Sequence, residues 1–494
     1  MTPREPSRRD VLRWSALAAG TLPLGALLAA CGSDDARRTS TAARRSGGPP
    51  PADGTTPWWL SDNFAPVKRE VEAFDLAVEG ALPKELTGLY VRNGSNPQHS
   101  DSSHWFFGDG MVHGIRLDGG KASWYRNRYV HTALYDSGQG FGASVPGGAT
   151  TQSNVSAIWH AGKLLTSGEV GYPHQLSPTD LGSMGLYDFD GRLTTAFTAH
   201  PKIDPATGML HCFGYGFTAP FLTYHVADAD GRLVHSEVVD IPRSTMIHDF
   251  AITDRDVVFW DLPVIFDLTA ATEWIKDPKS GKFPYRWDPE AGARLGVMPL
   301  GGPASAITWH DVDPCYVFHG LNAHRDGDKV VLDVGRLSSM FVPGEVFGGS
   351  LSERRWTIDT TTGHVDEHVV EADHPGDLPS RDPRLVGRKH RYGYLVQVRD
   401  PGHTVDFGGL IKRDDVQNRR EVWDPGPAVH SGEWLFVPTG TDEDAGYLLT
   451  YLYDDRTEKS EFVVIDATDV RRGPIARVPL PQRVPYGFHA AWVA

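Results

Sequence analysis

The chain has 494 residues, of which 40% are hydrophobic and 22% are charged. These proportions are typical of a soluble globular protein with a large core, built as one large domain or as two to three ordinary ones. The formal net charge of −15 argues against a nucleic-acid-binding protein, because phosphate recognition requires clustered lysines and arginines.

The first 30 residues have the features of an export signal. A twin-arginine motif, Ser-Arg-Arg-Asp-Val-Leu-Arg at 7–13, precedes an apolar run over 14–30. Glycine and proline interrupt that run, which favours a signal peptide over a membrane-spanning helix. The run ends in Leu-Ala-Ala-Cys31, which resembles the lipobox of bacterial lipoproteins, where the cysteine is acylated. The alternative is a chance cysteine beside an ordinary cleavage site.

We therefore expect residues 1–30 to be a twin-arginine lipoprotein signal peptide, which directs export of the folded protein. Lipidation of Cys31 would anchor the protein to the membrane surface, at the outer face of the bacterial cytoplasmic membrane. Residues 31–57 are rich in Ser, Thr, Ala, Arg, Gly and Pro without periodicity and predict a disordered tether. No comparable linker follows, so residues 58–494 are expected to form one domain.

Short apolar runs and turn signals alternate through this domain, as at 257–260 and 462–465, and long helical periodicity is absent. The 53 glycines and 36 prolines favour many turns. Asp118-Gly119, Asp190-Gly191, Asp230-Gly231 and Thr362-Gly363 are each followed by alternating polar and apolar residues, which predicts antiparallel hairpins. The sequence therefore predicts an all-β sandwich, barrel or propeller. No fixed repeat is visible, which excludes a regular propeller but not an irregular one.

Four histidines lie in apolar, turn-rich segments far apart in the chain: His200, His248, His319 and His489. His489 is notable because it lies in an apolar chain end, where a polar, frayed terminus is usual. Four imidazoles without a thiolate would suit a borderline transition metal, and the inner strands of a propeller could gather them at one axis. With 21 histidines in the chain, buried core histidines remain the alternative.

Motifs over the whole domain resemble the carotenoid cleavage oxygenases. They include Leu-Pro-Lys-Glu-Leu-Thr-Gly-Leu-Tyr-Val-Arg-Asn-Gly from Leu82, His-Trp-Phe-Phe-Gly-Asp-Gly from His104, Thr-Ala-His-Pro-Lys from Thr198, His-Asp-Phe from His248, Phe-His-Gly-Leu-Asn-Ala from Phe318 and Gly-Phe-His from Gly487. The resemblance implies an irregular seven-bladed β-propeller with Fe(II) on the central axis. It also implies that the four histidines named above are the iron ligands.

The same resemblance implies carboxylates behind three of the ligands, at Glu169, Asp377 and Glu433. An acceptor on the second ring nitrogen orients a ligating imidazole, and buried acids neutralise the ion. The family usually has glutamate where this chain has Asp377, which is one methylene shorter. We therefore expect that contact to run through a water or a shifted backbone.

The implied activity is cleavage of a conjugated carbon–carbon double bond into two carbonyl products with O₂. A carotenoid or apocarotenoid is the favoured substrate, and a lignostilbene or phenylpropanoid is the alternative. The stilbene-cleaving branch has a lysine directly before the first of these acids, where this chain has Gly168. A non-catalytic, ligand-binding propeller or a metal-dependent hydrolase stands as an alternative from another class. No feature indicates an obligate protein partner.

Two further questions stay open in the sequence. Cys212 and Cys315 could form a disulfide after export or remain buried thiols. The aromatic residues Trp105, Phe106, Trp159, Phe217 and Phe266 could line a substrate tunnel or simply pack in the core.

Overall fold

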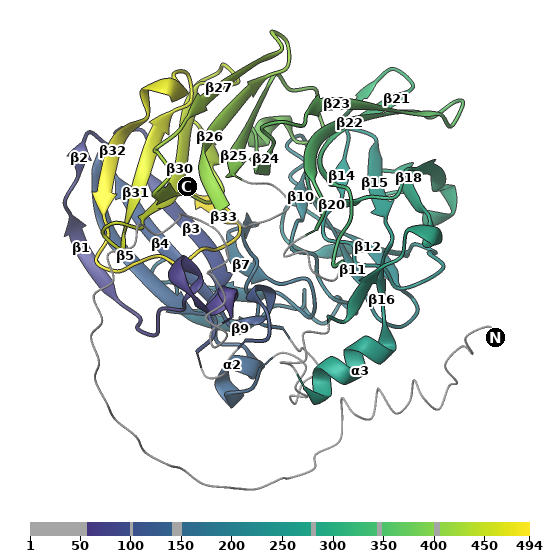
Figure 1. The fold of residues 1–494 in the computed structure, drawn as a ribbon, viewed down its shortest axis with the longest axis horizontal. Helices are drawn as coiled ribbons and strands as arrows, with labels where there is room; N and C mark the ends of the chain where they lie inside the picture. The colour runs from purple at the N-terminus through teal and green to yellow at the C-terminus, as the bar shows by residue number, and fades with distance from the viewer. Residues whose placement is uncertain (1–56, 99–101, 141–150, 278–282, 343–347, 400–405) are drawn as a thin grey trace, which may run out of the picture.

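The computed structural model describes residues 57–98, 102–140, 151–277, 283–342, 348–399 and 406–494. The predicted signal peptide, nearly all of the tether and Cys31 therefore lie outside the described residues. Among those residues, seven antiparallel sheets of four to six strands follow one another, and an eighth sheet is a two-stranded ribbon. Figure 1 shows the sheets arranged in a ring, which confirms the irregular seven-bladed β-propeller.

The blades are numbered I to VII in the order in which their sheets follow round the ring. Blade I contains β1 (Glu72–Leu76), β5 (Lys121–Tyr129), β4 (Gly110–Asp118), β3 (Gly88–Ser95) and β33 (Ala490–Val493). Blade II contains β6 (Ser156–His160), β7 (Lys163–Ser167), β8 (His174–Leu176) and β9 (Ser183–Leu186). Blade III contains β10 (Lys202–Ile203), β11 (Leu210–Tyr215), β12 (Leu222–Ala227) and β13 (Leu233–Val238).

The remaining blades complete the ring. Blade IV contains β14 (Ala251–Ile252), β15 (Asp256–Asp261), β18 (Ala293–Pro299) and β19 (Thr308–Val312), and blade V contains β20 (Tyr316–Asp326), β21 (Lys329–Leu337), β22 (Leu351–Asp359) and β23 (Val365–Glu371). Blade VI contains β24 (Gly376–Ser380), β25 (Tyr392–Arg399), β26 (Asp406–Asp414) and β27 (Arg419–Trp423). Blade VII contains β2 (Glu79–Gly80), β32 (Pro474–Pro479), β31 (Lys459–Asp466), β30 (Gly446–Asp454), β28 (Val429–His430) and β29 (Leu435–Pro438).

Helices are short and lie outside the blades. The α-helices are α2 (Ala133–Ser137) and α3 (Leu268–Lys276), and the ribbon pairs β16 (Val264–Phe266) with β17 (Tyr285–Trp287). The 3-10 turns are η1 (Trp58–Leu60), η2 (Asp62–Phe64), η3 (Trp105–Phe107), η4 (Pro289–Ala291), η5 (Ala304–Ala306), η6 (Pro383–Leu385) and η7 (Val470–Arg472). Within the described part of the chain, no helix is long and apolar enough to cross a membrane.

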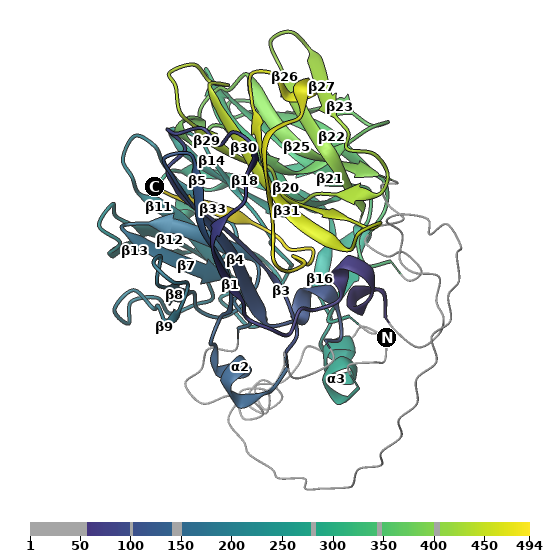
Figure 2. The ribbon, with the colours of Figure 1, turned by 90° about the vertical axis from the view of Figure 1, so that its left-hand side faces the viewer.

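The two ends of the domain close the ring together. The C-terminal strand β33 pairs with β3 in blade I, with Leu89 opposite Val493 and Arg92 opposite Ala490. The N-terminal strand β2 in turn completes blade VII by pairing with β32. Figures 1 and 2 show the yellow C-terminal strands beside the purple and blue N-terminal ones. The apolar chain end is therefore a paired strand of the first blade.

Three of the four predicted turn signals form hairpins. Asp118-Gly119 joins β4 to β5, Asp230-Gly231 joins β12 to β13, and Thr362-Gly363 joins β22 to β23. Each turn has a glycine at positive φ, as tight hairpins require. Asp190-Gly191 was wrongly predicted as a hairpin, because it lies in the connection between β9 and β10, which belong to different blades.

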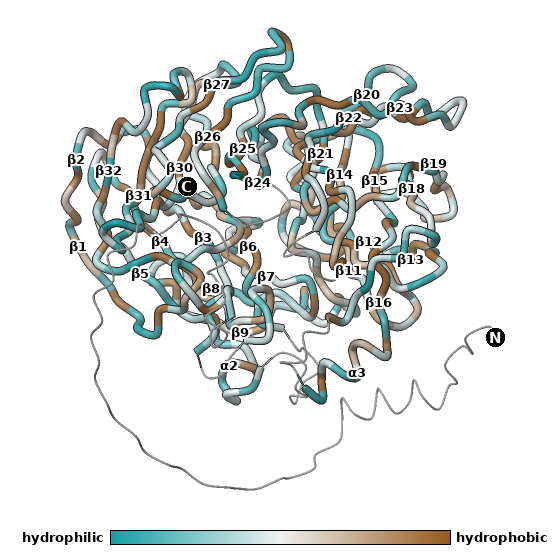
Figure 3. Tube along the Cα trace, viewed as in Figure 1, coloured by the Kyte–Doolittle hydropathy of each residue, from teal (hydrophilic) through white to brown (hydrophobic). Residues whose placement is uncertain are grey.

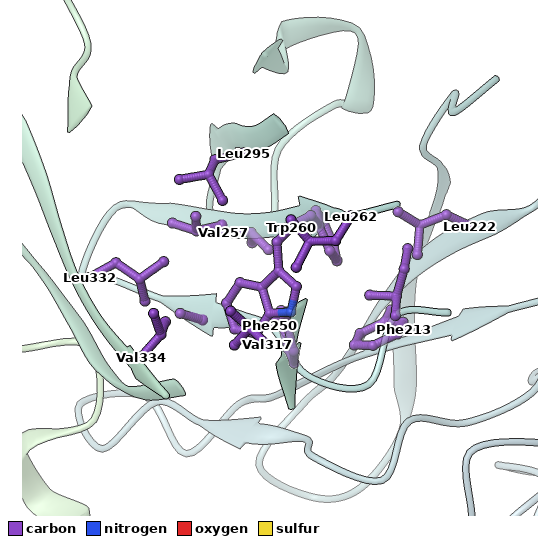
Figure 4. Packing of buried hydrophobic residues seen from close by; sticks show 14 of the residues in the cluster. Phe213, Leu222, Phe250, Val257, Trp260, Leu262, Leu295, Val317, Leu332 and Val334 are labelled. Atoms are coloured by element: carbon purple, nitrogen blue, oxygen red, sulfur yellow. The ribbon is translucent and has the colours of Figure 1, made fainter. Parts of the chain in front are cut away.

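The core of blades III, IV and V is continuous. Figure 4 shows the Trp260 indole among aliphatic and aromatic side chains from these blades, including Phe250, Val317 and Leu332. Figure 3 shows hydrophobic stretches along the strands and hydrophilic stretches in many outer loops. Cys212 and Cys315 are both buried free thiols, which decides against the disulfide. Burial raises the pKa of both thiols and so makes them poor nucleophiles.

Candidate metal centre

The innermost strands of the blades surround the axis, and the four candidate histidines lie in or just before four of these strands. These strands contact one another between neighbouring blades, β33 with β6, β14 with β20, and β20 with β24. His200 lies two residues before β10, His248 three residues before β14, His319 within β20, and His489 directly before β33. One imidazole therefore comes from each of blades III, IV, V and I.

The four imidazoles form one cluster. Their ring nitrogens include one set of four, one from each histidine, in which all lie within 4.8 Å of one another. Ring centroids of His200 lie 4.3 Å from His489, 4.6 Å from His248 and 5.2 Å from His319. The Nε2 atom of His319 is buried and has no hydrogen-bond partner, and such an orphaned nitrogen is satisfied by a metal ion.

Burial favours the neutral form of two of the four imidazoles, those of His200 and His248. Burial, together with the charge of neighbouring groups, holds the pKa of His200 and of His248 well below the ordinary value. Neutral imidazole is the form that binds a metal. The chemistry of the donor set therefore fits a transition-metal ion held by nitrogen ligands.

Three carboxylates stand behind three of these rings, and they come from the blades that supply no histidine. Glu169 of blade II hydrogen bonds Nδ1 of His248, and Asp377 of blade VI lies 2.9 Å from Nδ1 of His319. Glu433 of blade VII lies 3.2 Å from Nδ1 of His489 and accepts the Ala490 backbone N–H at 2.6 Å. Each acid fixes a ring so that Nε2 points into the cluster.

The contact of the shorter acid Asp377 is direct, through a shifted backbone rather than a water. The register of β24 against β25 changes between Asp377 and Ser380, which marks a β-bulge. Leu378 within this bulge adopts φ 47°. The bulge lies at the aspartate itself, and its shifted backbone accompanies the direct contact with His319.

Sequence reasoning missed three contacts around the cluster. The Tyr215 hydroxyl donates to Oε2 of Glu169, whose other oxygen bonds His248. Asp249 bonds the backbone next to His319 and the side chain of Lys202. The two residues of each pair lie 46, 71 and 47 positions apart in the chain, and no local pattern signals such pairs.

An apolar cavity opens on one side of the cluster. It has about 1040 Å³ of empty space, including its open mouth, and His248, His319 and His489 reach it. Of the proposed tunnel residues, Trp105, Phe106 and Phe217 line it. Phe266 and Trp159 do not, because Phe266 packs on Phe217 and Trp159 packs against the core between blades I and II. The other aromatic lining residues are Phe107, Tyr215, Phe283, Tyr285, Phe318, Phe407 and Phe488.

A second cavity, which is polar, also reaches the cluster. His200, His319 and His489 reach it, and its charged lining consists of Lys202, Asp249, Arg381 and Glu433. His200 reaches only this second cavity, whereas His248 reaches only the apolar one. The cluster therefore separates an apolar space from a polar one.

A second group of potential ligands lies between blades V and VI and does not fit a metal. Asp333, His390 and Asp415 lie close together, but Arg355 and Arg413 already bond both aspartates. These guanidinium groups neutralise the acids, and a cation would compete with them. The group is an ion-pair network that joins two blades.

The fold and the site define a seven-bladed propeller with a candidate metal centre that opens to a hydrophobic cavity. The family model described as retinal pigment epithelial membrane protein matches residues 64–494. A carotenoid cleavage oxygenase of Mycobacterium tuberculosis is 36% identical over 88% of this chain and 97% of its own. The chain belongs to the carotenoid oxygenase family, and it is an oxidoreductase of the non-heme iron dioxygenase type.

Two further relatives show how broad the family is. An isoeugenol monooxygenase of Pseudomonas nitroreducens is 31% identical over 88% of this chain and 97% of its own. The crystal structure of Pseudomonas brassicacearum lignostilbene dioxygenase superposes with a TM-score of 0.80 at 30% identity, covering 88% of this chain and 98% of that one. Membership of the family therefore leaves the substrate to be argued from the site.

Proposed function

We propose that the protein is an Fe(II)-dependent dioxygenase that cleaves a conjugated C=C bond of a carotenoid or apocarotenoid into two carbonyl products. One observation carries the proposal: a cluster of four imidazoles, three of them backed by carboxylates, opens into an aromatic cavity. His200, His248, His319 and His489 would hold the ion. Four ligands would leave coordination positions free for small molecules.

The bound ferrous ion would supply O₂ activation. The residues of the chain would bind the substrate, orient the metal ligands and exclude water. The aromatic walls would hold the polyene by apolar contact and keep water away from the reacting bond. Glu169, Asp377 and Glu433 would neutralise the buried charge and hold their rings in place, and no side chain is needed as a nucleophile or general base.

The composition of the cavity wall favours an apolar polyene over a phenol. Among the described residues that line the cavity, none is a lysine or arginine. Gly168 lies in the wall directly before Glu169, and a Cβ there would meet Thr151 Oγ1 at 3.2 Å. A phenolic stilbene would have uncharged polar partners, among them Thr151, Gln152, Asn154 and Tyr285, but no lysine or arginine. A lignostilbene or phenylpropanoid therefore remains the second candidate, supported by the two relatives named for such substrates.

The test is turnover of purified domain loaded anaerobically with Fe(II). Apocarotenals and hydroxystilbenes are offered with and without O₂, and loss of polyene absorbance and formation of aldehydes are followed. We expect O₂-dependent cleavage of the apocarotenals, faster than that of the stilbenes. Turnover without O₂ would indicate a hydrolase, and absence of iron at one equivalent would indicate a non-catalytic binding propeller. Either result would overturn the proposal.

The ligand set has its own test in His489→Ala. Loss of this imidazole should reduce iron content well below one equivalent. The matched control is His364→Ala, because His364 is exposed on blade V and remote from the cluster. Full iron occupancy in the His489 variant would show that the ligand set is wrong.

We further propose export by the twin-arginine route and a lipid anchor at Cys31, which would hold the enzyme at the membrane surface where a polyene dissolves. The motif at 7–13 and the Leu-Ala-Ala-Cys sequence support this proposal. Arg8→Lys with Arg9→Lys should block export. Cys31→Ser should release the exported protein from the membrane fraction, and unchanged fractionation of both variants would refute the proposal.

A further inference from the structure

Three of the four histidine-bearing segments meet at the Asp249 carboxylate. Oδ1 of Asp249 accepts from Lys202 Nζ at 2.6 Å, and Oδ2 accepts from the Gly320 backbone N–H at 2.9 Å. Lys202 follows His200 by two residues, Gly320 directly follows His319, and Asp249 itself directly follows His248. One carboxylate therefore joins the ligand segments of blades III, IV and V.

This carboxylate is buried and fully engaged. Asp249 is 1% exposed, and its Oδ1 also accepts from the Phe250 N–H at 2.7 Å. The Lys202 ammonium lies 5.8 Å from the Phe250 ring, so that the pair is enclosed on the side of the core. Removing one partner of such a pair leaves the other charged and unpaired, which is far more costly than losing a surface pair.

Strand β20 has a glycine, Gly320, at the point where its backbone contacts Asp249. A Cβ added at Gly320 would lie 3.2 Å from the Trp260 ring and 3.7 Å from Oδ2 of Asp249. The contact with the Trp260 ring is tight, so a larger side chain at this position would require the ring or the strand to shift. Trp260 and Phe250 are both buried in the continuous core of blades III to V (Figure 4).

His200 depends on this contact more than the other ligands do. Within the described part of the chain, no carboxylate bonds the His200 ring, and its backbone N–H donates to Thr198 Oγ1 at 3.1 Å. His489 is held differently, because its backbone N–H donates to Val155 O and its carbonyl accepts from Asn93 N, both at 3.1 Å. Asp249 is thus the link between His200 and the neighbouring ligand segments.

We propose that Asp249 is a positioning residue, which sets the spacing of His200, His248 and His319 by bonding Lys202 and the backbone of Gly320. This inference rests on the proposed metal centre. It assigns Asp249 no contact with substrate and no proton transfer. It separates the acids into two roles: Glu169, Asp377 and Glu433 orient individual rings, whereas Asp249 joins the strands that carry them.

The test compares Co(II) binding to the apoprotein of wild type and of Asp249→Asn. The variant keeps the shape of the side chain but loses the negative charge and replaces one acceptor oxygen by a donor. Metal affinity is measured by chelator competition, and ligand placement by the visible d–d bands of bound Co(II). We expect affinity to fall by about 10- to 100-fold, as for other groups that hold ligands in place, together with an altered d–d spectrum.

Asp256→Asn is the matched control for structural loss. Asp256 is also buried in blade IV and also pairs across to blade V, through Arg325 at 2.6 and 2.7 Å, but Arg325 lies near the end of β20, whereas Gly320 directly follows His319. Melting temperatures of both apoproteins are recorded alongside. We expect a similar thermal shift in the two variants but a spectral change in the Asp249 variant alone.

A second variant, Lys202→Met, removes the other half of the pair and keeps the test usable if Asp249→Asn does not fold. It should also alter the d–d spectrum, because the segment of His200 is released. Affinity within threefold of wild type with unchanged bands, or equal losses in the Asp256 control, would overturn the role of Asp249. Failure of wild type to bind Co(II) would instead overturn the metal centre itself.

Discussion

The Asp377 side chain shows how one short acid is fitted to a site through the backbone. Its 2.9 Å bond to His319 depends on the bulge in β24, in which Leu378 has φ 47°. A left-handed backbone at a leucine is unfavourable by about 1 kcal/mol or more, so the surrounding fold must hold it in place. The bulge and the aspartate are therefore matched to each other.

Asp377→Glu should weaken the centre, although it keeps the carboxylate. The added methylene would push the carboxylate against the His319 ring that the bulge has already brought close. We expect metal affinity to fall by about 10-fold, measured by chelator competition. Asp382→Glu is the control, because Asp382 caps η6 in the same segment without contacting a histidine. Equal affinities in wild type and Asp377→Glu would show that the bulge is not matched to the shorter acid.

Sequence reasoning identified the seven residues of the cluster because each lies in a recognisable motif. It missed the partners of Asp249 although His-Asp-Phe was one of those motifs. The bond between Asp249 and Gly320 spans 71 positions, and the bond to Lys202 spans 47. Contacts of this kind depend on how blades pack, and a single sequence carries no periodicity that reveals them.

At the scale of strands, His430 joins blades VI and VII. Its Nδ1 lies 2.8 Å from Asp406 at the start of β26, and its Nε2 lies 2.9 Å from Asp455 after β30. Burial opposes the charged imidazolium, but hydrogen bonds and the charge of both aspartates outweigh it and raise the pKa of His430 to about 9. Folding thus favours the protonated form.

His430→Gln should therefore destabilise the protein in a pH-dependent way. The folded pKa lies above the ordinary value of 6.5, so the stabilisation is complete below pH 6.5 and is lost as the pH rises through 9. The difference in unfolding free energy between wild type and variant should shrink by about 3 kcal/mol between pH 6 and 10, as measured by urea unfolding. His364→Gln, at an exposed pair with Asp366, serves as the control. A difference that is constant with pH would contradict this assignment.

Strands and hairpins were largely predictable, and the exceptions have physical causes. Alternating residues after Asp-Gly turns predicted β4–β5 and β12–β13, since local turn geometry sets those pairings. The strand pairing of blade IV was harder to predict from the sequence, because β16, α3 and β17 are inserted between β15 and its partner β18. Helix α3 has nine residues, too few for its periodicity to stand out among short apolar runs.

At the scale of the whole molecule, the metal centre and the closure of the ring are coupled through blade I. His489 directly precedes β33, and β33 pairs with β3 from the other end of the domain. The other three histidines come from blades III to V and share the continuous core of Figure 4. The position of the fourth ligand therefore depends in part on the pairing of the last strand. Loosening the closure should weaken metal binding without any change in a ligand or an acid.

The substitution Gly88→Ala should loosen the pairing of β33 with β3 and thereby weaken metal binding. A Cβ on Gly88 would lie 2.3 Å from the Trp492 indole and 2.8 Å from the Val493 carbonyl oxygen, so β33 must shift. We expect a loss of about 1–3 kcal/mol in stability and faster hydrogen exchange in 490–493. Gly114→Ala is the control in the same blade, because its Cβ would approach the flexible Leu181 side chain at 2.8 Å. Metal affinity should fall in Gly88→Ala alone, and unchanged affinity despite faster exchange would show that His489 is held independently of the closing strand.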